Sequence, residues 1–331
     1  MGKTDFFTRI YHYFIYHPLW LRLVEWSKTH SLPGLQRIPL YNLIKFISKE
    51  THDDAITTRA NSMAFSLFMA IFPSIIVLFT LLPYTPLYEM KINVDGQEEK
   101  FEDILHDNIE EVMPGEAGEM LFSTIKDIAT KPKSGLLSFG FFLAIWFASN
   151  GMLSMIHGLE KDYKATFKRR TDFQKRLIAL QLTFLVSVIL IASVIFVILG
   201  NTILYFVFQF VKVDFLTRMA FFALRWVVVI LLFYTLFSTI YRYGSSTRRK
   251  IPFINSGAVL ATFLSILTSW GFSFYVDNFG NYNTLYGSIG ALIVLMIWIQ
   301  LNCMILLIGF ELNAGIVVLR DQRREKKEAE S

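Results

Sequence analysis

The sequence predicts an all-α polytopic membrane protein with six transmembrane helices, an outer helical hairpin and N-terminal interfacial helices. Hydrophobic residues make up 53% of the 331 residues and charged residues 18%, with a mean hydropathy of +0.44. That leaves too little polar surface for a soluble body of this length. Apolar runs of about 20 residues, enough to cross a ~30 Å hydrocarbon core, recur along the chain. Lysines and arginines gather in alternate loops, a pattern that six spans explain.

Residues 1–58 are predicted to form a cytoplasmic, amphipathic segment at the membrane surface. Aromatic and aliphatic residues alternate there with bases and histidines, and a second amphipathic stretch, 40–49, runs up to the first span. Such mixtures suit the interface of a membrane more than its core. The start has no small-residue cleavage site after its apolar stretch, so it does not resemble a secretory signal.

The membrane domain is predicted to occupy residues 59–319. Its spans are expected at about 62–83, 135–157, 177–200, 219–241, 253–275 and 287–310. Pro73 predicts a kink in the first span, because proline removes a backbone hydrogen bond and clashes with the preceding turn. Gly200 and Asn201 mark the expected exit of the third span.

The loop between the first two spans, residues 84–133, is predicted to lie outside, because its acids outnumber its bases. Two stretches with apolar residues at helical spacing flank Pro114 and Gly115, which predicts an outer helical hairpin. The hairpin either caps the outer mouth of the bundle or lies on the lipid headgroups. Residues 320–331 are predicted to be a disordered, basic cytoplasmic tail. Both termini are therefore expected in the cytoplasm.

No catalytic signature is visible, so we expect neither an enzyme nor a cofactor. The sequence has no phosphate-binding glycine loop and no nucleophile elbow. Its six histidines are too scattered for a zinc site. The single cysteine, Cys303, falls in an apolar run and is expected to pack as a small hydrophobe. The net charge of +5 resides in the flanks of the spans, so no nucleic-acid partner is expected.

Polar residues inside the spans are the candidate functional residues, because burying them in hydrocarbon is costly unless they are paired or line a cavity. The substrate- or lipid-binding candidates within the spans are Arg225, Asn150, Gln300 and Asn302. Interhelical hydrogen bonding is the commoner role of such amides. Arg59 and Glu311 share a depth and are predicted to form an ion pair, either as a staple between the first and last helices or as part of a substrate site.

The junction before the last span carries a recognisable string, Asn278-Phe-Gly-Asn-Tyr-Asn-Thr-Leu-Tyr-Gly-Ser-Ile-Gly-Ala291. Together with the stretches 60–65, 72–73, 146–151 and 309–313, it resembles the YihY/BrkB (UPF0761) family of bacterial inner-membrane proteins over about residues 45–319. The resemblance implies a multi-pass protein of the bacterial inner membrane. It adds Asn281 and Asn283 as binding candidates. The family has been labelled ribonuclease BN, and members are linked to virulence and to export of lipopolysaccharide precursors.

The leading functional hypothesis is transport or handling of a lipid-like or anionic envelope precursor. The expected partners are membrane lipids and an anionic amphiphile such as a lipopolysaccharide precursor. One alternative is a membrane scaffold for envelope enzymes. The other is a tRNA-processing ribonuclease, which the residues do not support because phosphodiester hydrolysis usually needs a metal cluster or an acid–base pair.

Overall fold

The protein is a bundle of long helices with a small strand hairpin in one loop. The computed structural model describes residues 18–31, 34–36, 38–53, 56–81, 91–94, 97–100, 134–210, 215–278 and 288–329, and scattered positions between 103 and 127. The elements are, in chain order, α2 (Pro18–Thr29), α3 (Leu40–Asp53), α4 (Ile56–Leu81), β1 (Lys91–Val94), β2 (Gln97–Lys100), α7 (Ser134–Gly158), α8 (Asp172–Phe210), α9 (Phe215–Thr239), the π-helical turn η3 (Ile240–Gly244), α10 (Ser256–Asn278) and α12 (Ser288–Ala329).

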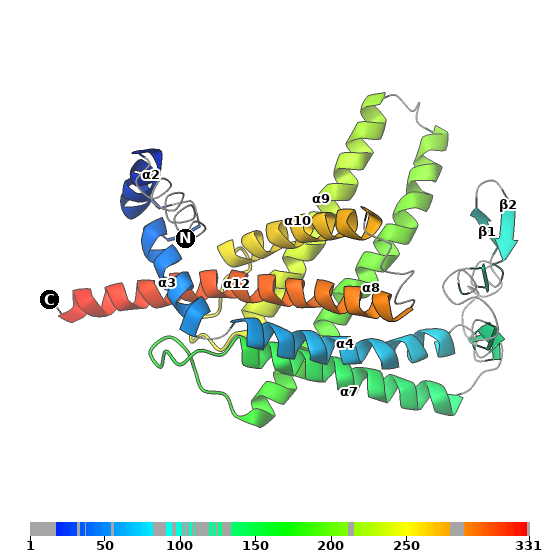
Figure 1. Cartoon of the computed structure of the whole chain (residues 1–331), viewed down its shortest axis with the longest axis horizontal. Helices are drawn as coiled ribbons and strands as arrows, with labels where there is room; N and C mark the ends of the chain where they lie inside the picture. The colour runs from blue at the N-terminus through cyan, green and yellow to red at the C-terminus, as the bar shows by residue number, and fades with distance from the viewer. Residues whose placement is uncertain are drawn as a thin grey trace, which may run out of the picture.

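Six of the described helices are long and apolar enough to cross a membrane, which confirms the predicted fold class. Figure 1 shows α4, α7 and α12 running side by side, with α10 along α12 and with α8 and α9 steeply inclined to them. The same figure shows α3 against the C-terminal half of α12, with α2 beside α3 on that side of the molecule. We call this the basic end, formed by α3, the loops 159–171 and 245–255, and the last turns of α12.

Two helices run further than the sequence predicted. The 39-residue α8 continues through Gly200 and Asn201, the expected exit of the third span. A glycine costs a helix only about 1 kcal/mol, whereas unpaired backbone in hydrocarbon costs several. In place of the predicted disordered tail, α12 continues to Ala329. Residues 321–329 are mostly strong helix formers without glycine or proline, so an already packed helix extends through them.

The loop between α4 and α7 contains an antiparallel strand hairpin that was not predicted. Lys91 pairs with Lys100 and Val94 with Gln97; the sequence between the two strands is Asp95-Gly96, a dipeptide that favours tight hairpins. The positions described between 103 and 127 are helical, where the helical hairpin was expected. Most of that hairpin, including Pro114 and Gly115, lies outside the described residues.

The N-terminal helix α3 packs against protein through its apolar face. Leu43 is fully buried and forms a small core with Leu35, Ile38 and Ile316 of α12. Glycine at 315 permits this approach, because a Cβ there would lie 2.8 Å from Phe46 Cδ1 and 2.9 Å from Leu43 Cδ1. The stretch 40–49, predicted to lie at the membrane surface, therefore packs partly against α12.

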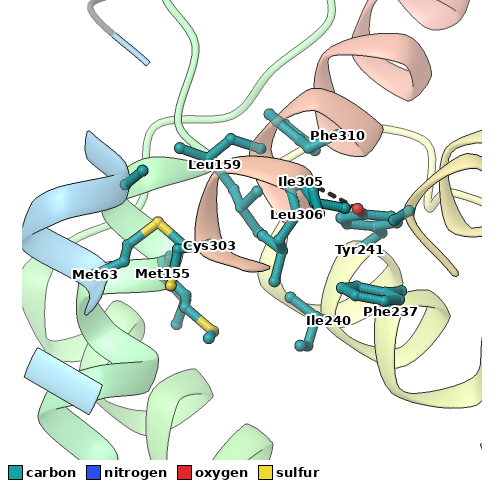
Figure 2. Close-up of a cluster of buried hydrophobic side chains, with 14 of the residues drawn as sticks. Met63, Met155, Leu159, Phe237, Ile240, Tyr241, Cys303, Ile305, Leu306 and Phe310 are labelled. Atoms are coloured by element: carbon teal, nitrogen blue, oxygen red, sulfur yellow. Dashed lines mark hydrogen bonds between the residues drawn. The ribbon is translucent and has the colours of Figure 1, made fainter. Parts of the chain in front are cut away.

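The main core lies where α4, α7, η3 and α12 meet, near the basic end. Figure 2 shows Tyr241 pointing at α12, where its hydroxyl donates to the carbonyl of Leu306 at 2.8 Å. Phe237 and Phe310 lie beside Tyr241, whereas Met63 and Met155 lie next to Cys303, which is buried as its apolar run predicted.

Candidate functional site

Three of the predicted binding residues cannot be placed by their side chains. Arg225 belongs to α9, but its side chain is outside the described part of the structure. Asn281 and Asn283 lie in residues 279–287, which are also outside it. Their predicted binding role stays a prediction.

The three candidate amides of the spans, Asn150, Gln300 and Asn302, are partly buried, and each has a separate partner. Asn150 Oδ1 accepts from Arg176 Nη1 of α8 at 2.5 Å. Gln300 Nε2 donates to Asn61 Oδ1 of α4 at 2.8 Å, and Asn302 Nδ2 donates to a carbonyl of its own helix. Within the described residues these amides do not bond to one another. The bonds of Asn150 and Gln300 join neighbouring helices, the commoner role of such amides, whereas that of Asn302 stays within α12.

The predicted pair of Arg59 and Glu311 is present, and it is part of a larger cluster. Arg59 Nη1 lies 3.5 Å from Glu311 Oε1, and Arg59 Nη2 donates to the carbonyl of Gly158. The Glu311 side chain is 0% exposed and that of Arg59 is 19% exposed. A fully buried carboxylate needs such cations, because desolvation strongly disfavours an uncompensated charge.

Lys161 and Glu50 complete this buried charge cluster, and sequence reasoning missed both. Lys161 Nζ lies 2.9 Å from Glu311 Oε1 and 2.7 Å from Glu50 Oε2, with its side chain 2% exposed. The Tyr163 hydroxyl donates to Glu50 Oε1 at 2.7 Å. Glu50 and Lys161 lie 111 residues apart in the chain, so no local pattern links them. The only signal was an acid on the polar side of an amphipathic stretch.

The cluster fastens the N-terminal helix to the bundle. Its two acids and two bases come from α3, α4, the loop after α7, and α12. Formal charges therefore balance inside it. Removing one partner of a buried pair costs about 3–5 kcal/mol, because the other charge stays buried.

The two loops of the basic end are tied together. Arg170 donates to the carbonyls of Gly244 and Ser245 at 2.7 and 2.6 Å. Backbone bonds between the loops, Lys168 N to Ser246 O and Arg248 N to Thr166 O, add a short ladder. Desolvation lowers the pKa of Arg170, and Glu160 opposes the shift. Arginine titrates so far above neutrality that it stays charged.

A second polar cluster holds the start of α10 against α12. Asn313 Oδ1 accepts from Gly257 N at 2.9 Å, and Asn313 Nδ2 donates to Asn255 Oδ1 at 2.8 Å. Asn255 Oδ1 also accepts from Ala258 N, as an N-cap residue does. The helix start is thus capped from both its own chain segment and the last span.

A half-open groove of about 280 Å³ lies beside this second cluster. Its walls come from the α2–α3 connection, the first turn of α10 and the last span. The lining residues are Gly34, Gln36, Ile251, Pro252, Ile254, Asn255, Ser256, Val259, Asn313, Ile316 and Val317. Among the residues that the structure describes, no group of three or more His, Cys, Asp or Glu side chains could hold a metal ion.

Six apolar helices, with ionic groups collected at one end, define a multi-pass integral membrane protein. The sequence profile of the virulence factor BrkB family matches residues 47–331. The chain belongs to this family, which confirms the resemblance.

Two relatives cover most of the chain. YfkH of Bacillus subtilis (strain 168), whose name describes it as ribonuclease-like, is 32% identical over 257 residues, 78% of this chain and 88% of that protein. A UPF0761 membrane protein of Vibrio campbellii is 25% identical over 276 residues, 82% of this chain and 81% of that protein. No solved structure matches the fold.

Proposed function

We propose that this protein transports or handles an anionic, lipid-like envelope precursor. The observation that carries the proposal is the surface of the basic end, where exposed bases from two loops adjoin exposed apolar side chains. The exposed bases are Lys164, Lys168, Arg169, Arg248, Arg249 and Lys250. Phe253 and Ile254, which begin three residues after Lys250, are exposed as well, Ile254 at 83%.

This combination fits an amphiphile with a negative headgroup. Each lysine or arginine near an anionic membrane surface contributes about 1 kcal/mol of attraction. The apolar pair beside the bases offers contact to a chain. Because the loops are hydrogen-bonded to each other, these groups hold fixed positions.

Handling of an amphiphile at the basic end needs no central cavity among the amides of the spans. The described side chains fill the centre of the bundle near Tyr241 and Phe310. Asn150, Gln300 and Asn302 are taken up by packing contacts. We therefore propose movement of the amphiphile along the helix surfaces, without covalent chemistry and without a cofactor.

A lipid-scrambling assay tests the proposal. The protein is placed in phosphatidylcholine vesicles containing fluorescent phosphatidylglycerol, and exposure of the label to a quencher is followed. The variant Arg249→Gln with Lys250→Gln should bind and move the anionic lipid about tenfold less well. The control, Arg324→Gln with Lys327→Gln, removes equal charge from the exposed last turns of α12. Equal binding and movement in empty and protein-containing vesicles would refute transport.

A scaffold for envelope enzymes is the second candidate, favoured by the rigid pairing of the two loops. It predicts that anionic lipid is bound but not moved. Binding without scrambling in the same vesicles would therefore favour the scaffold.

A ribonuclease is the third candidate, favoured only by the name of the Bacillus relative. The two buried acids, Glu50 and Glu311, are held by Lys161, and Tyr163 donates to Glu50. Purified, metal-replete protein that cleaves tRNA, with loss of cleavage in Glu311→Gln, would establish this activity. We expect that the purified protein does not cleave tRNA.

We further propose that the protein lies in the bacterial inner membrane with both termini in the cytoplasm. The bases of the basic end support this orientation, because positively charged loops stay on the cytoplasmic side.

A further inference from the structure

The groove beside the start of α10 opens onto a helix that faces outward. Only 17% of the apolar stretch of α10 is buried inside the protein, the smallest share among the six candidate spans. Val259, which lines the groove, is 57% exposed, and Ile254 at its edge is 83% exposed. In a bilayer, the apolar side chains at this mouth contact lipid.

The polar groups in the groove are already occupied. Asn255 Nδ2 donates to the carbonyls of Pro252 and Phe253, and Asn255 Oδ1 accepts from Asn313 and Ala258. Ser256 Oγ donates to Gly34 O at 3.1 Å. A ligand therefore meets mostly the apolar walls, which come from Ile251, Pro252, Val259, Ile316 and Val317.

Basic residues flank the wall residues in the sequence. Arg249 and Lys250 directly precede Ile251, and both are exposed. Arg320 follows Val317 by one turn of α12, and its Nη1 lies 3.5 Å from Oε1 of Gln36, another lining residue. Arg320 Nη2 also pairs with Asp321 Oδ1 at 3.2 Å, so Arg249 and Lys250 supply the positive charge beside the groove, whose walls are largely apolar.

We infer that this groove binds one acyl chain of an anionic membrane lipid, with the headgroup phosphate held by Arg249 and Lys250. The inference rests on the proposed function and gives it a site. An apolar channel beside cations complements a phospholipid, in which a charged phosphate is joined to a chain.

The N-terminal segment forms the third wall of this lipid site. Gly34, with a φ of +88°, turns the chain so that its carbonyl meets Ser256. The helix that follows, α3, is anchored by Glu50 in the buried charge cluster.

The test measures lipid retained by the full-length protein after transfer from vesicles of phosphatidylglycerol and phosphatidylcholine into detergent, using native mass spectrometry. Val259→Trp fills the groove and should lower retained phosphatidylglycerol about tenfold, because the chain loses its buried contacts. Leu267→Trp, two turns further along α10 and outside the groove, should retain as much as the wild type. Val259→Ser, which removes apolar wall without filling space, should give a smaller loss and guards against misfolding of the tryptophan variant.

The outcomes separate the groove from the function. Equal retention in Val259→Trp, Val259→Ser and the wild type, with loss in the Arg249→Gln and Lys250→Gln variant, overturns the groove site and leaves the proposed function standing. No preference of the wild type for phosphatidylglycerol over phosphatidylcholine overturns both. A dimer that Val259→Trp dissociates would show that a second copy fills the groove, which also overturns the lipid site.

Discussion

Lys161 shows how one side chain can join distant parts of a membrane protein. Its ammonium lies within 3 Å of carboxylates from α3 and from α12, and all three groups are largely shielded from solvent. An ammonium can donate three hydrogen bonds, so a single lysine can serve two acids. The residue acts as a fastener between the N-terminal helix and the last span.

Replacing this lysine should destabilise the protein strongly. Lys161→Met leaves Glu50 and Glu311 without their shared cation, and we expect a loss of about 3–5 kcal/mol in the free energy of unfolding. Thermal unfolding in detergent, followed by tryptophan fluorescence, measures it. The control is Lys164→Met in the same loop, which is exposed and should change stability by less than about 0.5 kcal/mol. Equal midpoints for the two variants would contradict the fastening role.

For the buried charge cluster, the sequence predicted one ion pair and missed the other two residues. Arg59 and Glu311 were paired correctly, because both are charged and fall at the same end of their spans. Lys161 and Glu50 were missed, since depth in a span cannot be assigned to residues in a loop or in a surface helix. Which charges meet there depends on how α3 folds back, and only the packing decides that.

Between helices, small residues set the distance from one helix axis to the next. A Cβ on Gly309 would lie 2.7 Å from the carbonyl oxygen of Gly257, so α10 and α12 cross in direct backbone contact. Gly158 and Gly151 receive Met63 and Leu67 of α4 in the same way. These two glycines of the second span thus allow α4 and α7 to pack closely.

The crossing of α10 and α12 should not tolerate a methyl group. In Gly257→Ala the new Cβ meets the carbonyl of Gly309 and the amide of Asn313, so the helices must separate. We expect a loss of about 1–3 kcal/mol or more. Gly271→Ala is the matched control, since nothing lies within 4 Å of its Cβ and alanine favours the helix by about 1 kcal/mol. If both variants unfolded at the wild-type temperature, the close crossing would be wrong.

A further prediction concerns the packing of α3 against α12. Gly315→Val would press on Phe46 and Leu43 and should release α3 from α12. Hydrogen exchange of residues 40–53 should then rise severalfold or more, because their backbone bonds open more often. Gly135→Val at the start of α7, with open space around it, should leave that exchange unchanged. Unaltered protection of α3 in Gly315→Val would argue against the packed helix.

At the scale of the whole molecule, we propose that the bases set the orientation of the protein in the membrane. The described loops 159–171 and 245–255 and the end of α12 meet at the basic end, as an even number of spans requires (Figure 1). A membrane potential opposes translocation of these lysines and arginines.

Fusion reporters should therefore place both termini on the same, cytoplasmic side. Green fluorescent protein is expected to fluoresce at either end, and alkaline phosphatase is expected to be active only when inserted in the loop near Lys91–Lys100. Alkaline phosphatase that was active at one terminus and inactive at the other would exclude six spans.

The sequence by itself determined the all-helical class, the six spans and the family, because these follow from the length and polarity of segments along the chain. Tertiary structure alone decided that α8 and α12 run past their expected ends, that α3 docks on α12, and that Lys161 joins Glu50 to Glu311. It also decided that three walls enclose a groove. These features depend on contacts between residues far apart in sequence, where local propensity and hydropathy carry no information about distance.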